Sequence, residues 1–283
     1  MATIEAPVLV LQKARKYTLP RGEVYLHNGA VTRDGQPLVN VTRWDADRVF
    51  NEAARQYAGK GFSIQPESLH ESWSAAEQDP DARDVLFTYP AKWQSPIVIP
   101  SNTPTETEVY ILRADGKALP LLGKPRIINP TQRFKEGDRE IVVGTVFDLP
   151  FKLSNGFYNG LEDLDPETGF LKQVRSEGKY RVWFSDDGKL HASVLSWGGD
   201  VICGWEPSDS DVHVGLRGRS TGNVPPELLE SEVDVLKYQL ARERRERAEE
   251  RQTFVGRVEE VEAYYRSGLE QLEQLKAGLQ DQK

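Results

Sequence analysis

The last sixty residues, from Val224 to Lys283, constrain this chain more than any other stretch. Pro225 and Pro226 open it and no further proline follows, which is typical of a helix whose first turn carries proline. Acidic residues come next, where the positive end of the helix dipole favours them. The sequence predicts one helix of about 56 residues and about 84 Å, which is longer than one globular core can cover.

Apolar residues recur along this helix at alternating steps of four and three, the spacing of a coiled coil. A stutter-like change of phase separates two seams. The first consists of Leu229, Val233, Leu236 and Leu240, and the second of Phe254, Val258, Val261, Tyr265, Leu272, Leu275 and Leu279, with Gly268 out of character. We expect these residues to form an interface with another copy of the chain or with another protein.

The segment between the seams, Ala241 to Thr253, carries five arginines and four glutamates. Arginine runs can bind the phosphates of nucleic acids. The glutamates cancel most of this positive field, and pairs such as Glu243 with Arg247 and Arg245 with Glu249 can hold a solvated helix. We therefore expect no nucleic acid as a partner.

The charge balance also argues against nucleic acids and anionic membranes, since the net charge is -8. The tail from Val224 has 14 acidic and 10 basic residues, so the rest of the chain is acidic too. Cys203 is the one cysteine, which excludes a disulfide within the chain. The first residues do not have the pattern of a signal peptide, and no apolar run has the length of a membrane span. The expectation is a soluble cytoplasmic protein.

Short extended segments separated by turn residues dominate the first 220 residues, which indicates a mainly β fold. The sequence predicts hairpins at 108–122 and 179–197, a strand at 140–147, a polar loop at 156–168, a helix after Asp45 and a second helix at 66–77. Strands do not alternate with helices, so a parallel doubly wound sheet is disfavoured. We predict an antiparallel sandwich or barrel with one or two inserted helices, plus the long C-terminal helix or coiled coil.

The predicted organisation is a β-rich domain at 1–218, in which 44–80 can be a helical insertion. A hinge follows at 219–225 and the coiled-coil helix occupies 226–283. Nothing repeats within the chain.

Cys203 is the best candidate for a nucleophile, because His191 and His213 are near it in sequence and Asp200 could orient a histidine. Its surroundings, Val-Ile-Cys-Gly-Trp, are typical of a buried strand, where cysteine acts as a small apolar side chain. Packing is the favoured interpretation, and a hydrolase or transferase at Cys203 and His213 is the alternative.

The acidic loop at 162–167 begins like a calcium-binding loop, but Thr168 and Val174 replace the glycine and the closing acid that such a loop needs. A solvated turn is the favoured interpretation. The four histidines and one cysteine cannot complete a structural zinc site, and no phosphate-binding glycine loop is present. We expect no metal and no cofactor.

Six tryptophans offer a further alternative, a ligand-binding module with a stacking face. Three of them, Trp183, Trp197 and Trp205, lie on the predicted C-terminal strands. Packing in the core or in an interface is the favoured role for such residues.

The nine residues from Tyr17 to Tyr25, YTLPRGEVY, resemble the opening of some phage tail and virion proteins. The match stops there and assigns no family. Together with the helix, it favours a non-enzymatic assembly protein, such as a virion component, in which a β-rich domain is joined to a coiled coil.

Overall fold

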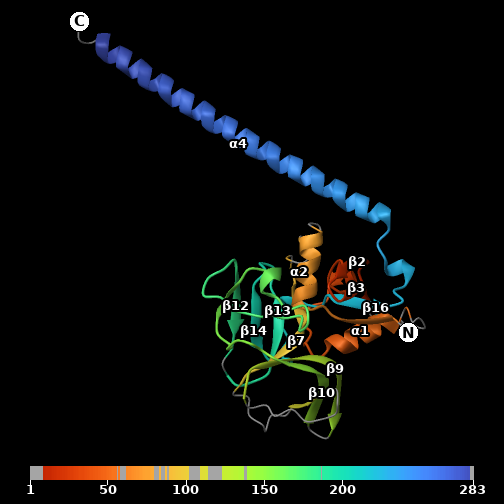
Figure 1. The fold of residues 1–283 in the computed structure, drawn as a ribbon. Coiled ribbons are helices and arrows are strands. Elements are labelled where there is room, and N and C mark those ends of the chain that lie inside the picture. The colour runs from red at the N-terminus through yellow and green to blue at the C-terminus, as the bar shows by residue number, and fades with distance from the viewer. Residues whose placement is uncertain are drawn as a thin grey trace, which may run out of the picture. The chain divides into compact units, whose positions relative to one another are not determined.

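The computed structural model describes residues 9–55, 57, 62–79, 83, 87, 89–101, 109–113, 123–136, 139–185 and 187–280. Its contacts divide the chain into two compact units, Met1–Glu230 and Ser231–Lys283. The first unit consists mainly of β-sheets and the second of one long helix (Figure 1). The prediction of a mainly β fold with a long C-terminal helix is confirmed.

The largest sheet has nine strands in the order β11-β12-β14-β13-β7-β9-β10-β8, with β15 paired to β7 (Figure 1). It is mixed, because β12 runs parallel to β14, β8 to β10 and β15 to β7. These three pairs depart from the antiparallel arrangement that the sequence predicts, whereas the other pairs of this sheet are antiparallel. No sheet closes into a barrel within the described residues. The strands are β7 (Ala91–Ile99), β8 (Val109–Arg113), β9 (Arg126–Glu136), β10 (Arg139–Asp148), β11 (Gly156–Tyr158), β12 (Tyr180–Phe184), β13 (His191–Leu195), β14 (Val201–Trp205) and β15 (Val214–Gly215).

The predicted hairpin at 179–197 is wrong in its pairing, although both strands exist. β14 lies between β12 and β13 and hydrogen-bonds to both. Every residue of β13 is buried, so this strand needs a neighbour on each side, and β14 and β7 supply them. Turn residues such as Gly188 report a change of direction, but they do not determine which strand comes to lie alongside.

The other predicted segments of this region have mixed outcomes. β10 covers the strand expected at 140–147, and the loop at 156–168 contains β11 and a 3-10 helix, η1 (Leu161–Asp163). The hairpin expected at 108–122 is seen only as β8, because its turn and its second strand lie outside the described residues.

Two smaller sheets involve the N-terminal residues. One has the order β2-β3-β16-β6 and is antiparallel throughout, and the other has the order β1-β4-β5. Residues 219–222 of the hinge expected at 219–225 belong to β16, which lies between β3 and β6 and hydrogen-bonds to both. The strands are β1 (Leu9–Val10), β2 (Ala14–Leu19), β3 (Gly22–His27), β4 (Thr32–Arg33), β5 (Gln36–Pro37), β6 (Phe62–Pro66) and β16 (Gly218–Gly222).

Both helices expected in the β-rich unit are present, as α1 (Ala46–Arg55) and α2 (Leu69–Gln78). α1 buries Val49, Phe50 and Ala53, the apolar face that its sequence predicts. α2 starts three residues later than expected because Ser68 caps it. The Ser68 hydroxyl accepts from the backbone N–H of Glu71, and the Glu71 carboxylate accepts from the backbone N–H of Ser68.

Two apolar clusters dominate the core. One surrounds α1 and includes Phe50, Trp93 and Leu216. The other gathers Trp73 of α2 with Phe170 and the inner residues of β12 and β14. Burial of these side chains fixes the sheet edges and loops that surround the site described next.

The C-terminal helix, α4 (Glu232–Gln280), runs without interruption for 49 residues, which corresponds to about 73 Å. It begins six residues later than expected. Pro226 opens a separate 3-10 helix, η2 (Pro226–Leu228), and Ser231 caps α4 through reciprocal hydrogen bonds with Asp234. Leu229, expected to open the first seam, instead forms a bridge with Ala14 in the β-rich unit.

Candidate functional site

The structure gives Cys203 the features of a packing residue. It is fully buried in the apolar cluster around Trp73, and burial raises the pKa of its thiol. Its candidate bases have other neighbours. His191 Nε2 lies 2.8 Å from Asp187 Oδ1, and the His213 ring packs against the rings of Tyr89 and Trp197. A nucleophilic cysteine needs a stabilised thiolate, which this environment does not provide.

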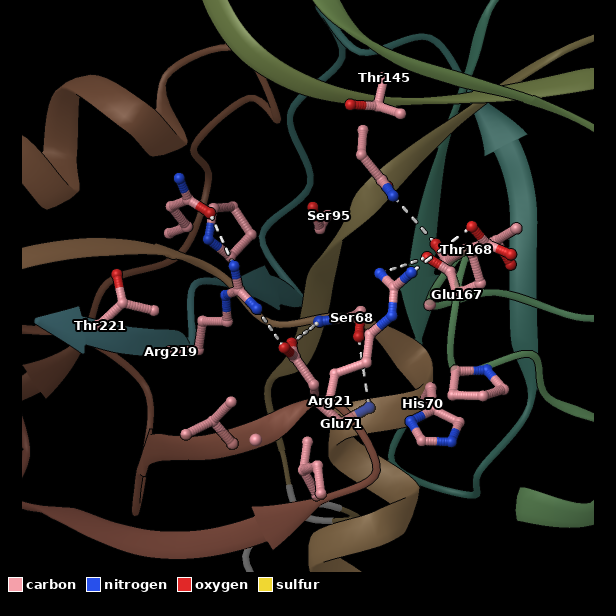
Figure 2. Close-up of a pocket in the computed structure, with 18 of the residues that line it drawn as sticks. Arg21, Ser68, His70, Glu71, Ser95, Thr145, Glu167, Thr168, Arg219 and Thr221 are labelled. Atoms are coloured by element: carbon pink, nitrogen blue, oxygen red, sulfur yellow. Dashed lines mark hydrogen bonds and ion pairs between the residues drawn. The ribbon is translucent and has the colours of Figure 1, made fainter.

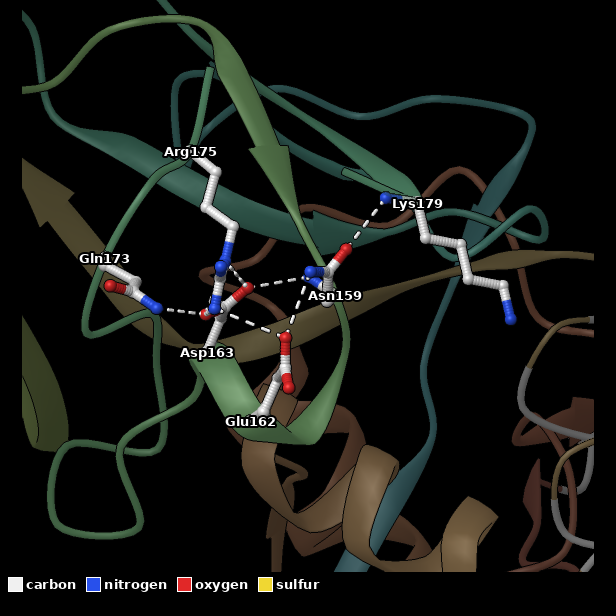
Figure 3. Close-up of polar contacts among 6 residues, drawn as sticks. All are labelled: Asn159, Glu162, Asp163, Gln173, Arg175 and Lys179. Atoms are coloured by element: carbon white, nitrogen blue, oxygen red, sulfur yellow. Dashed lines mark hydrogen bonds and ion pairs between the residues drawn. The ribbon is translucent and has the colours of Figure 1, made fainter. Parts of the chain in front are cut away.

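An ion pair between the buried carboxylate of Asp163 and the partly exposed Arg175 holds the acidic loop together (Figure 3). Asp163 is fully buried, and its carboxylate accepts hydrogen bonds from Arg175, from Gln173 and from the backbone N–H of Asn159. Burial alone would raise the pKa of Asp163, but these hydrogen bonds outweigh it and lower the pKa. The oxygens that a cation would need are therefore engaged by protein donors. Within the described residues, no group of three or more His, Cys, Asp and Glu side chains could hold a metal ion.

The three C-terminal tryptophans have different environments. Trp205 packs edge to face on the buried Trp93, whereas Trp183 and Trp197 are about half exposed. Trp197 forms a small aromatic group with Tyr89 and His213, with ring centroids 6.1 and 6.4 Å from its own. Trp197 therefore packs with Tyr89 and His213 and not with the other two C-terminal tryptophans.

A polar cavity of about 570 Å³ lies where the β2–β3 turn meets the start of α2 and strands β9, β10 and β16 (Figure 2). The loop at 166–169 closes one side. Gly169, at φ +73°, makes this closure possible, because a Cβ there would lie 2.7 Å from Ser68 Cβ. The polar residues on the wall include Arg21, Ser68, His70, Glu71, Ser95, Asn129, Thr145, Glu167, Arg219 and Thr221.

Both arginines of the cavity have carboxylate partners (Figure 2). Arg219 pairs with Glu71 and also donates to Gln65 Oε1 at 3.3 Å. Arg21 lies 3.6 Å from the Glu167 carboxylate and donates to the Glu167 carbonyl oxygen. Burial lowers the pKa of His70, which favours the neutral imidazole. The cavity therefore offers hydroxyl, amide and imidazole groups but little uncompensated charge.

Charged groups are also buried next to this cavity. Glu67, the residue between β6 and Ser68, lies 3.4 Å from Arg217, and both side chains are fully buried. Lys92 is buried in the same region, and burial together with the charge of Arg217 lowers its pKa to about 7. Burying the charged Glu67 and Arg217 side chains is costly, so this ion pair is weak evidence for stability.

Sequence reasoning missed this cavity. Its wall comes from segments more than 190 residues apart, and only the Ser68-x-x-Glu71 cap carries a local signal. Neither Arg219 nor His70 belongs to a motif.

The second surface of interest is a row of apolar side chains on α4, the α4 stripe. Its members are between 40% and 68% exposed, although the hydrophobic effect favours burial of such side chains. The α4 stripe consists of Val233, Leu236, Leu240, Phe254, Val258, Val261 and Tyr265. The side chains of the other predicted seam residues, Leu272, Leu275 and Leu279, lie outside the described part.

The arginine-rich segment of α4 has the solvated character that its sequence predicts. Arg247 lies 3.6 Å from Glu243, as expected for a pair four residues apart, and both side chains are largely exposed. No helix in the described part of the chain is long and apolar enough to cross a membrane.

Comparison with known proteins gives no relative. No protein-family model matches the chain, and neither a curated protein nor a solved structure is significantly similar to it.

Proposed function

We propose that this chain is a non-enzymatic assembly protein, in which the β-rich unit is joined to partners through α4. The observation that carries the proposal is the α4 stripe. Nine large apolar side chains are exposed along the described part of α4, and seven of them lie on one face. Singly exposed apolar residues are ordinary, whereas a row of them marks an interaction surface. A component of a virion or of another large assembly is the version that the resemblance at 17–25 favours.

The length of α4 supports this proposal. Isolated helices are marginally stable in water, and most helical stability in proteins comes from packing of an apolar face. A helix of 49 residues with charged residues through its middle needs another helix against which to pack.

The test is the mass of the intact chain in solution and of two matched double variants, measured by light scattering. Phe254→Asp with Val258→Asp places two charges in the α4 stripe, and Gln252→Asp with Ala263→Asp places two on the opposite side of the helix. We expect the intact chain and the second variant to be oligomeric. The first variant should be monomeric, because an unpaired charge buried in an interface costs several kcal/mol.

Circular dichroism of both variants distinguishes lost assembly from lost helix. A monomeric intact chain whose α4 is nevertheless fully helical would overturn the proposal in its self-assembling form. Equal assembly of the two double variants would show that the α4 stripe is no interface.

The polar cavity favours a second candidate function, the binding of a small ligand. Its volume of about 570 Å³ is in the range of ligand pockets. Because both of its arginines are paired with carboxylates, a neutral, hydroxyl-rich molecule such as a sugar suits it better than an anion. Thermal unfolding with simple sugars tests this idea. A stabilisation that Thr221→Val and Ser95→Ala abolish would support it, and no shift with any sugar would remove it.

A further inference from the structure

Resting on the proposed function, we infer that the partner of α4 is another copy of this chain, aligned parallel and in register along the whole helix. Three features of α4 carry this inference: the alignment of its two apolar segments, the charged residues between them, and the charges beside the stripe.

The two apolar segments lie on one face of the helix despite the change of phase between them. Leu240 and Val258 are 18 residues apart, which is five turns at 3.6 residues per turn. At about 100° per residue, all seven members of the α4 stripe fall within a sector of about 80°. Because α4 is unbroken from Glu232 to Gln280, one partner helix can contact both segments. An 18-residue step is the sum of a 7-residue repeat, which gives a left-handed supercoil, and an 11-residue repeat, which gives a right-handed one. The two tendencies cancel, so the two helices should run nearly straight over this part.

Charged residues continue the same sector through the middle of α4. Glu243, Arg247 and Arg251 fall on the stripe by the same geometry, and Glu243 and Arg247 form an ion pair within the chain. A shifted register would place these charges against apolar residues of the partner. Polar residues within a coiled-coil seam fix register at some cost in stability. In the parallel register each of the three meets its own copy, and the ion pair between Glu243 and Arg247 within each helix offsets part of the repulsion between like charges.

The residues beside the stripe favour the parallel orientation. In parallel pairs, a residue just before one seam position meets the residue five places later on the partner. Arg257, before Val258, is followed five places later by Glu262, so Arg257 of each copy faces Glu262 of the other. This pair is attractive.

An antiparallel pair centred on Arg247 is the main competitor. It would match Leu240 with Phe254 and Leu236 with Val258, but only residues up to Val261 would find a partner within the other helix. The remainder of α4, including Tyr265, would extend past the point where the partner helix begins. The parallel arrangement is the one that covers the full apolar length.

Disulfide cross-linking distinguishes the parallel from the antiparallel arrangement, because the natural chain has no exposed thiol that would form cross-links of its own. Its single cysteine, Cys203, is fully buried. Leu236→Cys and Val261→Cys each place one thiol on the stripe, and Glu260→Cys places one on the opposite side of the helix. After mild oxidation, we expect disulfide-linked dimers from each of the first two variants and none from Glu260→Cys.

A mixture of the Leu236→Cys and Val258→Cys variants tests the antiparallel arrangement. Cross-links that form between these two variants, while Leu236→Cys alone forms none, would mean an antiparallel pair and overturn the inference, yet the proposed function would stand. A natural chain that is monomeric by mass would overturn this inference together with the self-assembling form of the proposed function. Equal cross-linking of Glu260→Cys and Val261→Cys would mean random collision and would also refute the parallel register.

Discussion

His27 should make the stability of the β-rich unit depend on pH in the acidic range. Its imidazole is buried, and burial is the main reason that its pKa falls to about 4 from an ordinary value of 6.5, with the charge of Arg217 acting in the same direction. Nδ1 lies 2.5 Å from the Gln12 carbonyl oxygen, which can only accept, so Nδ1 carries the proton. Nε2 then accepts from the Ser220 hydroxyl at 2.6 Å. This arrangement holds the neutral ring.

The sign and size of the effect follow from these two pKa values. Between pH 6.5 and 4 the unfolded chain binds a proton at His27 that the folded chain does not bind. The contribution of neutral His27 to the free energy of unfolding is therefore complete above pH 6.5 and is lost as the pH falls toward 4. A difference of about 2.5 units at 1.36 kcal/mol per unit gives a loss of about 3 kcal/mol between pH 7 and 4. Burial also lowers the pKa of His70, which adds to this loss, whereas burial raises the pKa of Glu67, which opposes it.

The contribution of His27 is isolated by comparing urea unfolding of the natural chain and of His27→Gln across this pH range. The natural chain should lose about 3 kcal/mol more than the variant, because the other groups contribute to both profiles. His213→Gln, which removes an exposed histidine, is the matched control substitution. If the natural chain and His27→Gln lose equal stability on acidification, the buried neutral imidazole is not the cause.

Three further changes test other buried groups. In urea unfolding, the free energy of unfolding of the natural chain should rise by about 2 kcal/mol between pH 7 and 9, because burial lowers the pKa of Lys92 to about 7 and the unfolded chain binds an extra proton in this range. Lys92→Met should abolish this rise. A rise that persists in the variant would contradict the reasoning. Asp163→Asn should cost about 2 kcal/mol of unfolding free energy by weakening its hydrogen bonds with Arg175, whereas Glu162→Gln, at an exposed carboxylate, should cost under about 0.5 kcal/mol. Cys203→Ala should lower the free energy of unfolding by about 1 kcal/mol or less. Because the Cys203 thiol is buried, it should react slowly with thiol reagents in the folded chain, and rapid labelling would contradict its role as a packing residue.

Local sequence signals predicted the elements of this fold better than their arrangement. The apolar face of α1 and the 3.6-residue spacing along α4 are properties of neighbouring residues, so the sequence contains them. The insertion of β14 between β12 and β13 depends on contacts between distant segments, and turn residues do not report those. The proline pair at 225–226 misplaced the start of α4, although the Ser231-x-x-Asp234 cap was readable in the sequence.

The buried polar groups were out of reach for the same reason. His27 meets Ser220 across 193 residues, and Arg219 meets Glu71 across 148. No motif joins these partners, because each pair depends on β16 returning to the N-terminal strands. The cavity that Arg219 and Glu71 help to line is likewise a product of the tertiary fold.

The position of β16 also determines when this chain can fold during its synthesis. The sheet of β2, β3 and β6 has a gap that only residues 218–222 fill, and Glu230 then pairs with Arg15 and Asn28 near the N-terminus. Synthesis runs at about 5–20 residues per second, so the N-terminal strands wait on the order of ten seconds or more for their neighbour. Residues 231–283 emerge from the ribosome after β16. The described strands of the β-rich unit are therefore all synthesised before α4 is complete.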